Sequence, residues 1–357
     1  MHPHVSIVIL NWNTTDNTLV CLNHLLASSF QKFEVIVVDN GSTREERERL
    51  HTAYGNHPKI KIIYNGNNRG FCQGNNIGIL NSDQRSKWGM TLNGDTKVGK
   101  KWLEELVNAV ERTGAWGGTC TQFKEEYAKV FGSTSVTGFG GLYTDASLTE
   151  EFRRTHLLET LAVSGAWFIF DKQRLGLPYP DDYFMYAEDV HLGMRIWLQG
   201  GKVMRYYSTD PEGFAEHFGG HVLQKRRRQF AAYIGTRNRL TNFLYFYCMG
   251  TIVKVLPLVL LTQVAYTLMT PRLLPARIAA FTWLFTHPRA IWRGRMLIQH
   301  QRKVPDKVLL RLQTCNMTNE VEVQGRAAKA LVRTCNRVFL VYGRLVGLQT
   351  RDLVPDS

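Results

Sequence analysis

Residues 88–96 read WGMTLNGDT, an apolar run followed by a short polar turn that carries one carboxylate, Asp95. In α/β proteins, ligands bind outside the carboxyl ends of the strands. Mg²⁺ in such sites commonly takes one or two carboxylates together with substrate phosphates. Taken alone, three polar residues after an apolar run are more often a plain turn. The meaning of Asp95 therefore depends on the segments around it.

Three similar apolar runs precede this stretch, and polar residues follow each of them. The runs are Val5–Leu10 before Asn11-Trp12-Asn13, Phe33–Val38 before Asp39-Asn40-Gly41-Ser42, and Lys59–Tyr64 before a Gly/Asn-rich segment. Helices are expected between them, from Thr14–Asp16 to Ser28, over Arg44–Tyr54, and from Gly70 onward. This alternation predicts an α/β domain with a mainly parallel sheet flanked by helices.

Polar residues that end parallel strands meet at one edge of the sheet. Asn11, Asp39, Asn68, Arg69 and Asp95 would therefore line a single ligand crevice. Plainer alternatives exist for each residue; Asp39, for example, is also suited to capping the helix after it. The glycines between 70 and 78 lack both Walker and G-x-G-x-x-G spacing and also suit a tight turn. Four polar strand ends in succession favour a ligand site.

The positive charge of the chain is concentrated in one region. The 357 residues carry a formal net charge of +14. Residues 225–357 hold 22 Lys and Arg but only 5 Asp and Glu, a net charge of +17, and residues 1–224 have a net charge of −3. No acidic residue occurs between Glu216 and Asp306. We therefore divide the chain into a domain of residues 1–235 and a basic helical region of residues 236–357.

The cysteines and the N-terminal residues indicate the cellular compartment in which the protein folds. The six cysteines are scattered without a C-x-x-C pair, which argues against both a zinc site and a disulfide framework and fits a reducing environment. The first residues, MHPHVSIVIL, lack a basic n-region and a small-residue cleavage site. We expect the folded domain to face the cytoplasm.

Several motifs resemble a known family when they are taken in order. They are VSIVILNWN (5–13), VIVVDNGS (35–42), NRGFCQGNNIG (68–78) and TLNGDT (91–96), followed by VSGAWFIFDKQRL (163–175), FMYAEDVHLGMRIWLQGG (184–201) and AEHFGGHV (215–222). Together they resemble the family 2 glycosyltransferases of GT-A fold over roughly residues 4–240, and most closely the rhamnosyltransferase-like branch. The resemblance implies a Rossmann-like sheet and a nucleotide-sugar donor.

The resemblance also implies a divalent metal site. It gives Asp95 the role of holding Mg²⁺ or Mn²⁺ against the donor diphosphate, and His217 the role of a second protein ligand. Asn93 departs from the family, which often has Asp there. An amide offers a carbonyl oxygen but no charge, so Asn93 is suited to contact the ribose or a metal-bound water.

The general base implied by the resemblance is Asp189. The paired acids Glu188-Asp189 begin an expected helix, where the positive end of the helix dipole keeps a carboxylate ionised. By helix rules alone, Asp189 is equally suited to be an N-cap without chemistry. His191 stands where the family usually has another acid.

The remaining assignments concern the donor and its neighbours. The resemblance places Asp39 at the edge of the pyrimidine base, and Asn11 and Arg69 near the base or ribose. Gly165 would lie under the sugar, where a small residue leaves room; a close-packed strand is the alternative. His221 is interpreted as structural or acceptor-side rather than as a further metal ligand.

The basic region has the composition of a membrane-surface segment. Between Leu240 and Pro271 the only charged residue is Lys254, and Pro257 interrupts the second apolar run. Lys is unfavourable at the centre of a span, by about 2.5–3.5 kcal/mol. We therefore expect one or two helices lying in the interface of an anionic membrane, with a single or re-entrant span as the alternative. Residues 308–347 form an amphipathic helix that would also suit a dimer interface.

Aromatic residues interleave with arginines beyond residue 272, as in Trp292-Arg293. This pattern suits either a membrane interface or nucleic acid. The long uncharged runs favour lipid, so we expect no nucleic-acid partner.

These observations predict a metal-dependent, inverting glycosyltransferase bound peripherally to the cytoplasmic face of a membrane. The expected reaction moves rhamnose from dTDP-rhamnose to a lipid-linked or cell-surface glycan acceptor. The alternatives are a hexosyl or galactofuranosyl transferase using a UDP-sugar, a nucleotidyltransferase on a similar sheet, and a catalytically silent membrane-binding module.

Overall fold

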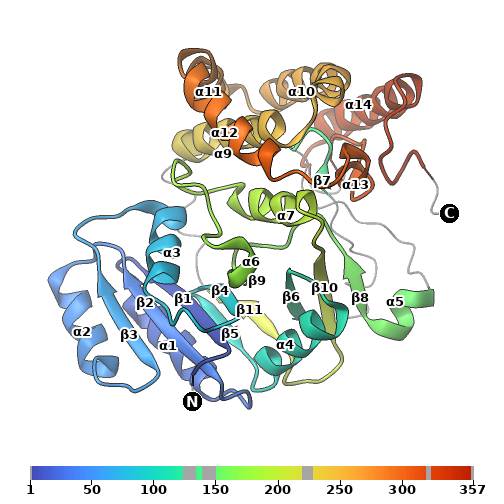
Figure 1. Ribbon diagram of the computed structural model, residues 1–357. Coiled ribbons are helices and arrows are strands. Elements are labelled where there is room, and N and C mark those ends of the chain that lie inside the picture. Colours follow the sequence, from blue (N-terminus) through green and yellow to red (C-terminus); the bar gives the residue numbers. More distant parts are fainter. Residues whose placement is uncertain (1, 124–133, 139–149, 219–227, 319–322, 355–357) are drawn as a thin grey trace.

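The computed structural model describes residues 2–123, 134–138, 150–218, 228–318 and 323–354. Its centre is a sheet with the strand order β3-β2-β1-β4-β9-β6-β10-β8 (Figure 1). The strands of this sheet are β1 (Val5–Asn11), β2 (Phe33–Asp39), β3 (Ile60–Tyr64), β4 (Trp88–Asn93), β6 (Gly117–Gln122), β8 (Leu157–Glu159), β9 (Trp167–Asp171) and β10 (Val203–Ser208).

The first half of the sheet is the parallel part, as predicted. β2, β1 and β4 pair in parallel, and β3 extends the set on the outside. The helices between these strands are α1 (Thr15–Leu26), α2 (Arg44–Tyr54) and α3 (Gly70–Leu80). The prediction of a mostly parallel sheet flanked by helices is therefore confirmed.

The two faces of the sheet belong to separate apolar clusters because side chains alternate along a strand. Ile7 and Ile9 of β1 face one cluster, which contains residues of α1 and of α4 (Trp102–Thr113). Val8 faces the other cluster, which contains residues of α3, α7 (Glu188–Leu198) and the C-terminal helices. Strands that are buried on both faces need continuous apolar runs, and this explains the sequence of β1 and β2.

The strand register brings polar residues together at one edge. Asn11 is paired with Asp39, and Leu10 with Asn93. Beyond β4 the turn at Gly94-Asp95 leads into β5 (Thr96–Val98), which pairs antiparallel with β11 (Ala215–His217). This small second sheet places His217 next to the end of β4.

The second half of the sheet contains antiparallel strands that the sequence pattern did not reveal. β9 lies antiparallel between β4 and β6, while β10 runs parallel to β6 and carries β8 on its outer side. A short helix, α5 (Glu150–Thr155), precedes β8, and another, α6 (Lys172–Leu175), follows β9. The antiparallel β9 begins at the same edge where β4 ends, since Leu92 pairs with Trp167.

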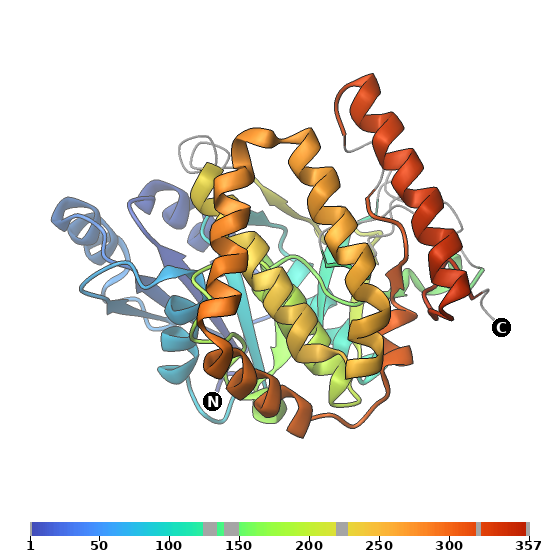
Figure 2. The ribbon, with the colours of Figure 1, turned by 90° about the horizontal axis from the view of Figure 1, so that it is seen from above.

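The C-terminal helices form a layer over α7 on one side of the molecule (Figure 1). They are α9 (Arg228–Phe246), α10 (Met249–Met269), η2 (Pro271–Leu273), α11 (Leu274–Thr286), α12 (Pro288–His300), α13 (Asp306–Leu310) and α14 (Arg326–Leu345). Seen from above, α10 and α11 are the arms of a hairpin joined at η2, and α14 lies outermost (Figure 2). Pro257 lies inside α10, so it does not end the helix that contains the second apolar run, whereas the first apolar run is divided between the end of α9 and the start of α10.

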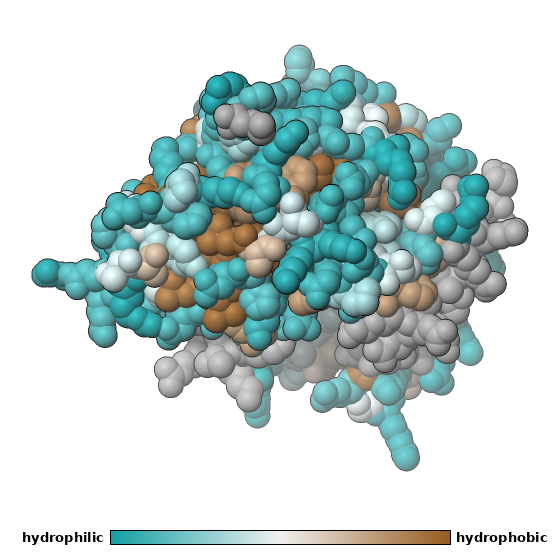
Figure 3. Space-filling view, turned by 90° about the horizontal axis from the view of Figure 1, so that it is seen from below, coloured by the Kyte–Doolittle hydropathy of each residue, from teal (hydrophilic) through white to brown (hydrophobic). Residues whose placement is uncertain are grey.

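This layer is fastened to the sheet domain at several points. The residue boundary drawn at 235/236 falls inside α9, which packs against α7. A short parallel pair joins β12 (Gln313–Thr314) to β7 (Thr134–Ser135). The face of the molecule turned away from the helical layer is mainly hydrophilic, with smaller apolar areas (Figure 3).

Candidate active site

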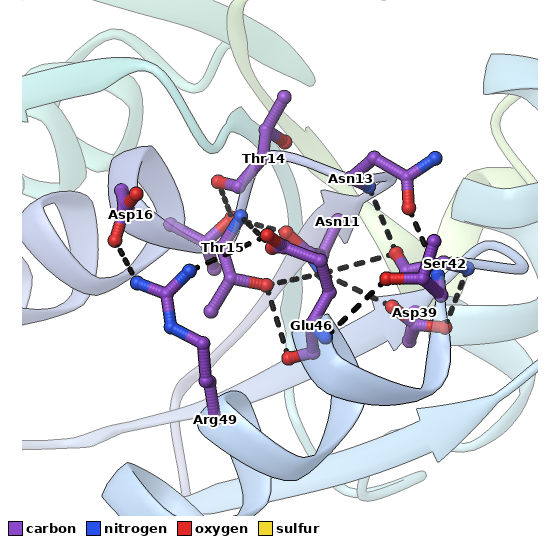
Figure 4. A network of polar contacts seen from close by, with 11 residues as sticks. Asn11, Asn13, Thr14, Thr15, Asp16, Asp39, Ser42, Glu46 and Arg49 are labelled. Carbon is purple, nitrogen blue, oxygen red and sulfur yellow. Dashed lines mark hydrogen bonds and ion pairs between the residues drawn. The ribbon is translucent and has the colours of Figure 1, made fainter.

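The ends of β1 and β2 are joined by a buried hydrogen-bond network (Figure 4). The Asn11 amide donates to Asp39 Oδ2 at 3.0 Å and accepts from Thr18 Oγ1 at 2.9 Å. The Ser42 hydroxyl accepts from the backbone N–H of Asn13 at 2.9 Å. Asn11 and Asp39 are both fully buried. Asn11 therefore fixes the two strand ends relative to each other.

Asp39 is engaged by protein groups on both oxygens. Its Oδ1 accepts from the backbone N–H of Ser42 at 3.0 Å and from Nε of Arg47 at 2.9 Å. Arg47 is 32% exposed, so it is the solvent-facing partner. The helix cap of α2 is Thr43, whose hydroxyl accepts from the N–H of Glu46. A ligand reaching Asp39 would have to displace Arg47 or bind beside it.

Asn68 and Arg69 lie in the loop after β3, next to the same edge. Asn68 Oδ1 accepts from Asn40 Nδ2 at 3.1 Å and from the backbone N–H of Gly70 at 2.8 Å. The backbone N–H of Arg69 donates to Asn40 Oδ1. The Arg69 side chain is exposed. Asn68 thus shapes the loop, whereas Arg69 is available to a ligand.

Asp95, His217 and Asn93 come together at the end of β4. His217 Nε2 lies 3.6 Å from Asp95 Oδ1 and 3.3 Å from Asn93 Nδ2. The backbone carbonyl of Asp95 accepts from the N–H of Phe218 at 3.0 Å, which holds the two segments together. The side chains of His217 and Asp95 are 41% and 20% exposed. A carboxylate and an imidazole thus converge on one accessible point, although they are 122 residues apart in the sequence.

The chemistry of this pair suits a divalent cation whose other ligands come from a phosphate-bearing substrate and water. Within the described ranges, no three His, Cys, Asp or Glu side chains gather at one point. Asp95 and His217 alone would not fill the coordination of Mg²⁺ or Mn²⁺. They leave open positions, as a substrate-bridging ion requires.

Gly94 is needed for close packing behind this turn. A Cβ at Gly94 would lie 2.9 Å from Thr18 Oγ1, which donates its proton to Asn11. The glycine therefore lets the Asp95 turn rest directly on the Asn11 network. The motif Asn93-Gly94-Asp95 consequently contains one packing residue and two residues whose side chains face His217.

The first residues around β9 connect this corner with the predicted base. Gly165 donates its N–H to Asp189 Oδ2 at 3.3 Å. The neighbouring Ala166 accepts from the N–H of Asn93 at 2.7 Å, and the Trp167 ring packs edge-on against His217 at 5.2 Å. A Cβ at Gly165 would lie only 3.2 Å from Glu188 Oε1. Residues 165–167 thus contact Asn93 and His217 on one side and Asp189 on the other.

The paired acids at the start of α7 lie in a poorly solvated environment. Burial raises the pKa of Asp189, while the backbone N–H groups of Val190 and Gly165 and the charge of Arg239 oppose that rise. Burial and the neighbouring Asp189 charge raise the pKa of Glu188, whose Oε2 has no hydrogen-bond partner among the described residues. Raised carboxyl pKa values in a cleft are typical of groups that exchange protons.

α9 supplies residues of this site that the sequence reasoning missed. Asn238 donates to the carbonyl oxygens of Met185 and Tyr186 at 2.9 and 2.8 Å. Asn242 donates to the carbonyl of Ala187 at 2.9 Å. Tyr186 and Ala187 both adopt positive φ angles, 68° and 62°. α9 therefore holds the strained turn that presents Glu188 and Asp189.

His191 and Arg237 serve this support rather than a ligand. His191 Nδ1 lies 2.9 Å from Asn242 Oδ1, and burial, with the Arg195 charge, lowers the His191 pKa to about 3. Arg237 is buried and donates to Asn238 and to the carbonyl of Asp182. Isolated asparagines in a basic, apolar stretch gave no sequence signal for these contacts. His221 lies outside the described residues.

The comparisons with known proteins agree with the motif resemblance. Residues 6–171 match the sequence profile of "Glycosyl transferase family 2". The glycosyltransferase AglE of Haloferax volcanii is 33% identical over 117 residues, which is 31% of this chain and 37% of that protein. The chain thus spans little more than a third of this relative.

Solved structures of low sequence identity share the fold. GalNAc-T7 with UDP, GalNAc and Mn²⁺ has a TM-score of 0.58 at 14% identity, covering 80% of this chain and 56% of that chain. Residues 1–349 of S. aureus TarS in complex with UDP-GlcNAc give a TM-score of 0.51 at 13% identity, covering 97% and 92%. Over residues 6–171 the chain is thus similar to the glycosyl transferase family 2 proteins, and its fold is GT-A-like.

Proposed function

We propose that the protein transfers a sugar from a nucleoside diphosphate donor to an acceptor hydroxyl. The observation that carries the proposal is the convergence of Asp95 and His217 at 3.6 Å, joined through residues 165–167 to Asp189. A donor diphosphate bound at Asp95 and His217 would place its sugar toward Asp189. GalNAc-T7, which shares the fold, was solved with a nucleotide and Mn²⁺, and this supports a similar donor here.

The donor diphosphate would lie against Asp95 and His217. A divalent cation bound by these side chains would neutralise the charge that develops on the leaving diphosphate. The 3.3 Å contact between Asn93 Nδ2 and His217 Nε2 would be released when that nitrogen binds the cation, and Asn93 would then contact the ribose or a metal-bound water. Arg69, exposed at the same edge of the sheet, would contact the base or ribose, and Asp39 would bind the base edge after Arg47 moves aside.

Asp189 would act as the general base in a single displacement. The acceptor oxygen forms a bond to the anomeric carbon, its proton passes to Asp189, and the bond from that carbon to the nucleoside diphosphate breaks. The configuration at the anomeric carbon is inverted because attack is opposite to the leaving group. Its raised pKa makes Asp189 a stronger base than an ordinary carboxylate.

We propose rhamnose from dTDP-rhamnose as the donor, with UDP-hexose or UDP-galactofuranose donors as the alternative. A panel of donors tests this directly by the nucleotide released. Release of dTDP with dTDP-rhamnose supports the first proposal, and release of UDP supports the alternative. Release of pyrophosphate would indicate a nucleotidyltransferase. Absence of release with every donor and a lipid extract would favour the silent membrane-binding module.

We further propose that the acceptor is lipid-linked and that the helical layer rests on an anionic membrane. Exposed apolar side chains lie on α10, α11 and α12, including Val253, Leu260, Leu268, Phe285 and Trp292. α10 is long and apolar enough to cross a membrane by length and composition, and 39% of its most apolar window is buried in the protein.

α10 has two apolar sides with different environments. Ile252, Val255, Leu258 and Val259 pack on the protein, and the opposite side is exposed. A helix packed along one side on its own protein is suited to lie in the membrane surface, with its exposed side toward lipid. Lys254 is exposed and would reach anionic head groups.

A further inference from the structure

A cavity of about 440 Å³ lies between α10 and α11, near the turn that joins them. Its walls are apolar residues from both helices, among them Val264, Leu268, Ile278 and Phe281. Val264, Leu268 and Ile278 are more than half exposed, so the cavity opens to the surface of the helical layer. The volume is within the range of small-molecule sites. No role in sugar transfer accounts for it.

Gln263 lines this cavity, and its side-chain amide is buried without a hydrogen-bond partner among the described residues. Gln263 is 7% exposed, and neither its Nε2 nor its Oε1 has a hydrogen bond to any described residue. Gln263 is one of the residues that line the cavity. A buried amide that forms no hydrogen bond is costly, so such groups usually mark the position of a ligand or an ordered water.

Arg277 lines the same cavity and has no carboxylate partner among the described residues. It is 8% exposed and donates to Thr270 Oγ1 at 2.6 Å, with longer contacts to the Thr270 carbonyl and Thr267 Oγ1. None of its contacts within the described ranges is to a carboxylate, and the chain has no acidic residue between Glu216 and Asp306. A guanidinium with little solvent and no acid favours an anion, and its fork matches a phosphate.

We propose that this groove binds one apolar chain of a phosphate-bearing membrane lipid, with the phosphate against Arg277 and Gln263. This apolar groove has one buried guanidinium, that of Arg277, in its wall. It therefore matches a ligand that consists of an apolar chain with one anionic end. The groove opens on the exposed apolar face of α10 and α11, where such lipids would be at high local concentration. The inference does not depend on sugar transfer, since it concerns binding in the helical layer alone.

The test is calorimetric titration of the full-length protein with dodecyl phosphate below its micelle concentration. We expect one saturable site. Ile278→Trp and Val264→Trp, which fill the groove from either wall, should each weaken binding at least tenfold. Val341→Trp, at an exposed position on α14, is the matched control and should bind as wild type does. Equal binding by wild type and both groove variants, or non-saturable uptake, would overturn the proposal.

The head group is tested separately from the chain. Arg277→Gln should weaken the binding of dodecyl phosphate at least tenfold while changing the binding of uncharged dodecyl maltoside less than twofold. Inorganic phosphate should not compete at tenfold excess over dodecyl phosphate. Competition by phosphate alone, or an equal loss for both detergents in a folded variant, would contradict the proposed lipid orientation. Self-association that dodecyl phosphate does not reverse would instead identify a second copy as the occupant.

Discussion

Glu188 and Asp189 are adjacent carboxylates whose environments differ. Asp189 accepts hydrogen bonds from the N–H groups of Val190 and Gly165, whereas one Glu188 oxygen has no partner among the described residues. Hydrogen bonds to a carboxylate favour its charged form. Asp189 is therefore the acid that stays ionised, and Glu188 is the one that holds a proton at higher pH. This division supports Asp189 as the base.

The charge of Arg239 is one of the influences that lower the pKa of the proposed base, Asp189. Arg239 lowers the pKa of Asp189, so Arg239→Gln should raise that pKa. Because the base must be deprotonated, the acid limb of the kcat/KM profile should move to higher pH. Arg239→Lys keeps the charge and should retain the wild-type profile. Superimposable profiles for all three proteins would show that Arg239 does not act on the base.

The metal corner makes a second prediction for single residues. Asp95→Asn removes the charge that would bind a divalent cation, so Mn²⁺ should no longer tighten nucleoside diphosphate binding. We expect the Mn²⁺-dependent gain in affinity to fall at least tenfold, measured by titration with and without EDTA. Glu216→Gln, an exposed acid next to His217, is the control and should keep that gain. An Asp95→Asn variant with undiminished Mn²⁺ dependence would contradict the metal assignment.

At the scale of elements, the sequence predicts the parallel half of the sheet well. The strands β1 and β2 and the helix α2 lie within one residue of their expected ends, because apolar runs and polar punctuation determine them locally. The antiparallel position of β9 depends on pairing between segments about 75 residues apart, which no local pattern reports. The Asp39–Arg47 ion pair was not predicted either. α2 contains three arginines, and the sequence does not indicate which of them contacts Asp39.

α9 makes the strongest prediction at this scale. Asn238→Ala removes two hydrogen bonds to the turn before Glu188, so the base should lose its position. We expect kcat to fall roughly tenfold to a hundredfold with donor affinity unchanged, because small displacements of a reacting group have such effects. Thr241→Ala, whose hydroxyl bonds only within α9, is the control. An equal loss in both variants would indicate general damage to the helix.

His191 should make the packing of α7 on α9 sensitive to acid. Its pKa is about 3 in the folded protein, below the ordinary value of 6.5, so the unfolded chain binds the extra proton between these values. The contribution of neutral His191 to the free energy of unfolding is fully present above about pH 6.5. It should be lost as the pH falls below that value, by up to about 1.4 kcal/mol per pH unit. Urea unfolding at pH 7.5 and 5.5 should show a smaller difference for His191→Gln than for wild type. His300→Gln, on α12, should behave as wild type.

At the scale of the whole molecule, the basic helical region contacts the candidate active site and also carries the proposed membrane surface. α9 contacts the turn before Glu188 and Asp189, and α10 to α12 expose apolar side chains on the other side of the layer. The composition of this region predicts a membrane surface, and this remains a prediction. It did not indicate that α9 also supports the site, because composition does not reveal the partner of a buried polar side chain.

Flotation with liposomes tests the membrane surface. The double variant Phe285→Ser, Trp292→Ser should lose most of its binding to liposomes that contain phosphatidylglycerol, since both residues are strongly exposed and apolar. Wild-type binding should weaken as salt rises, because the surface is basic. Leu80→Ser, an equally exposed apolar residue on α3, is the matched control. Unchanged flotation of the double variant would remove this face from membrane contact.

The central claim is that Asp189 removes the acceptor proton while Asp95 and His217 hold the donor. The measurement that tests it most directly is nucleoside diphosphate release in a single turnover, with a membrane lipid extract as acceptor, by wild type and Asp189→Asn at matched donor occupancy. We predict that Asp189→Asn binds the donor within twofold of wild type and releases nucleotide at least a thousandfold more slowly. Release at the wild-type rate by this variant would contradict the account.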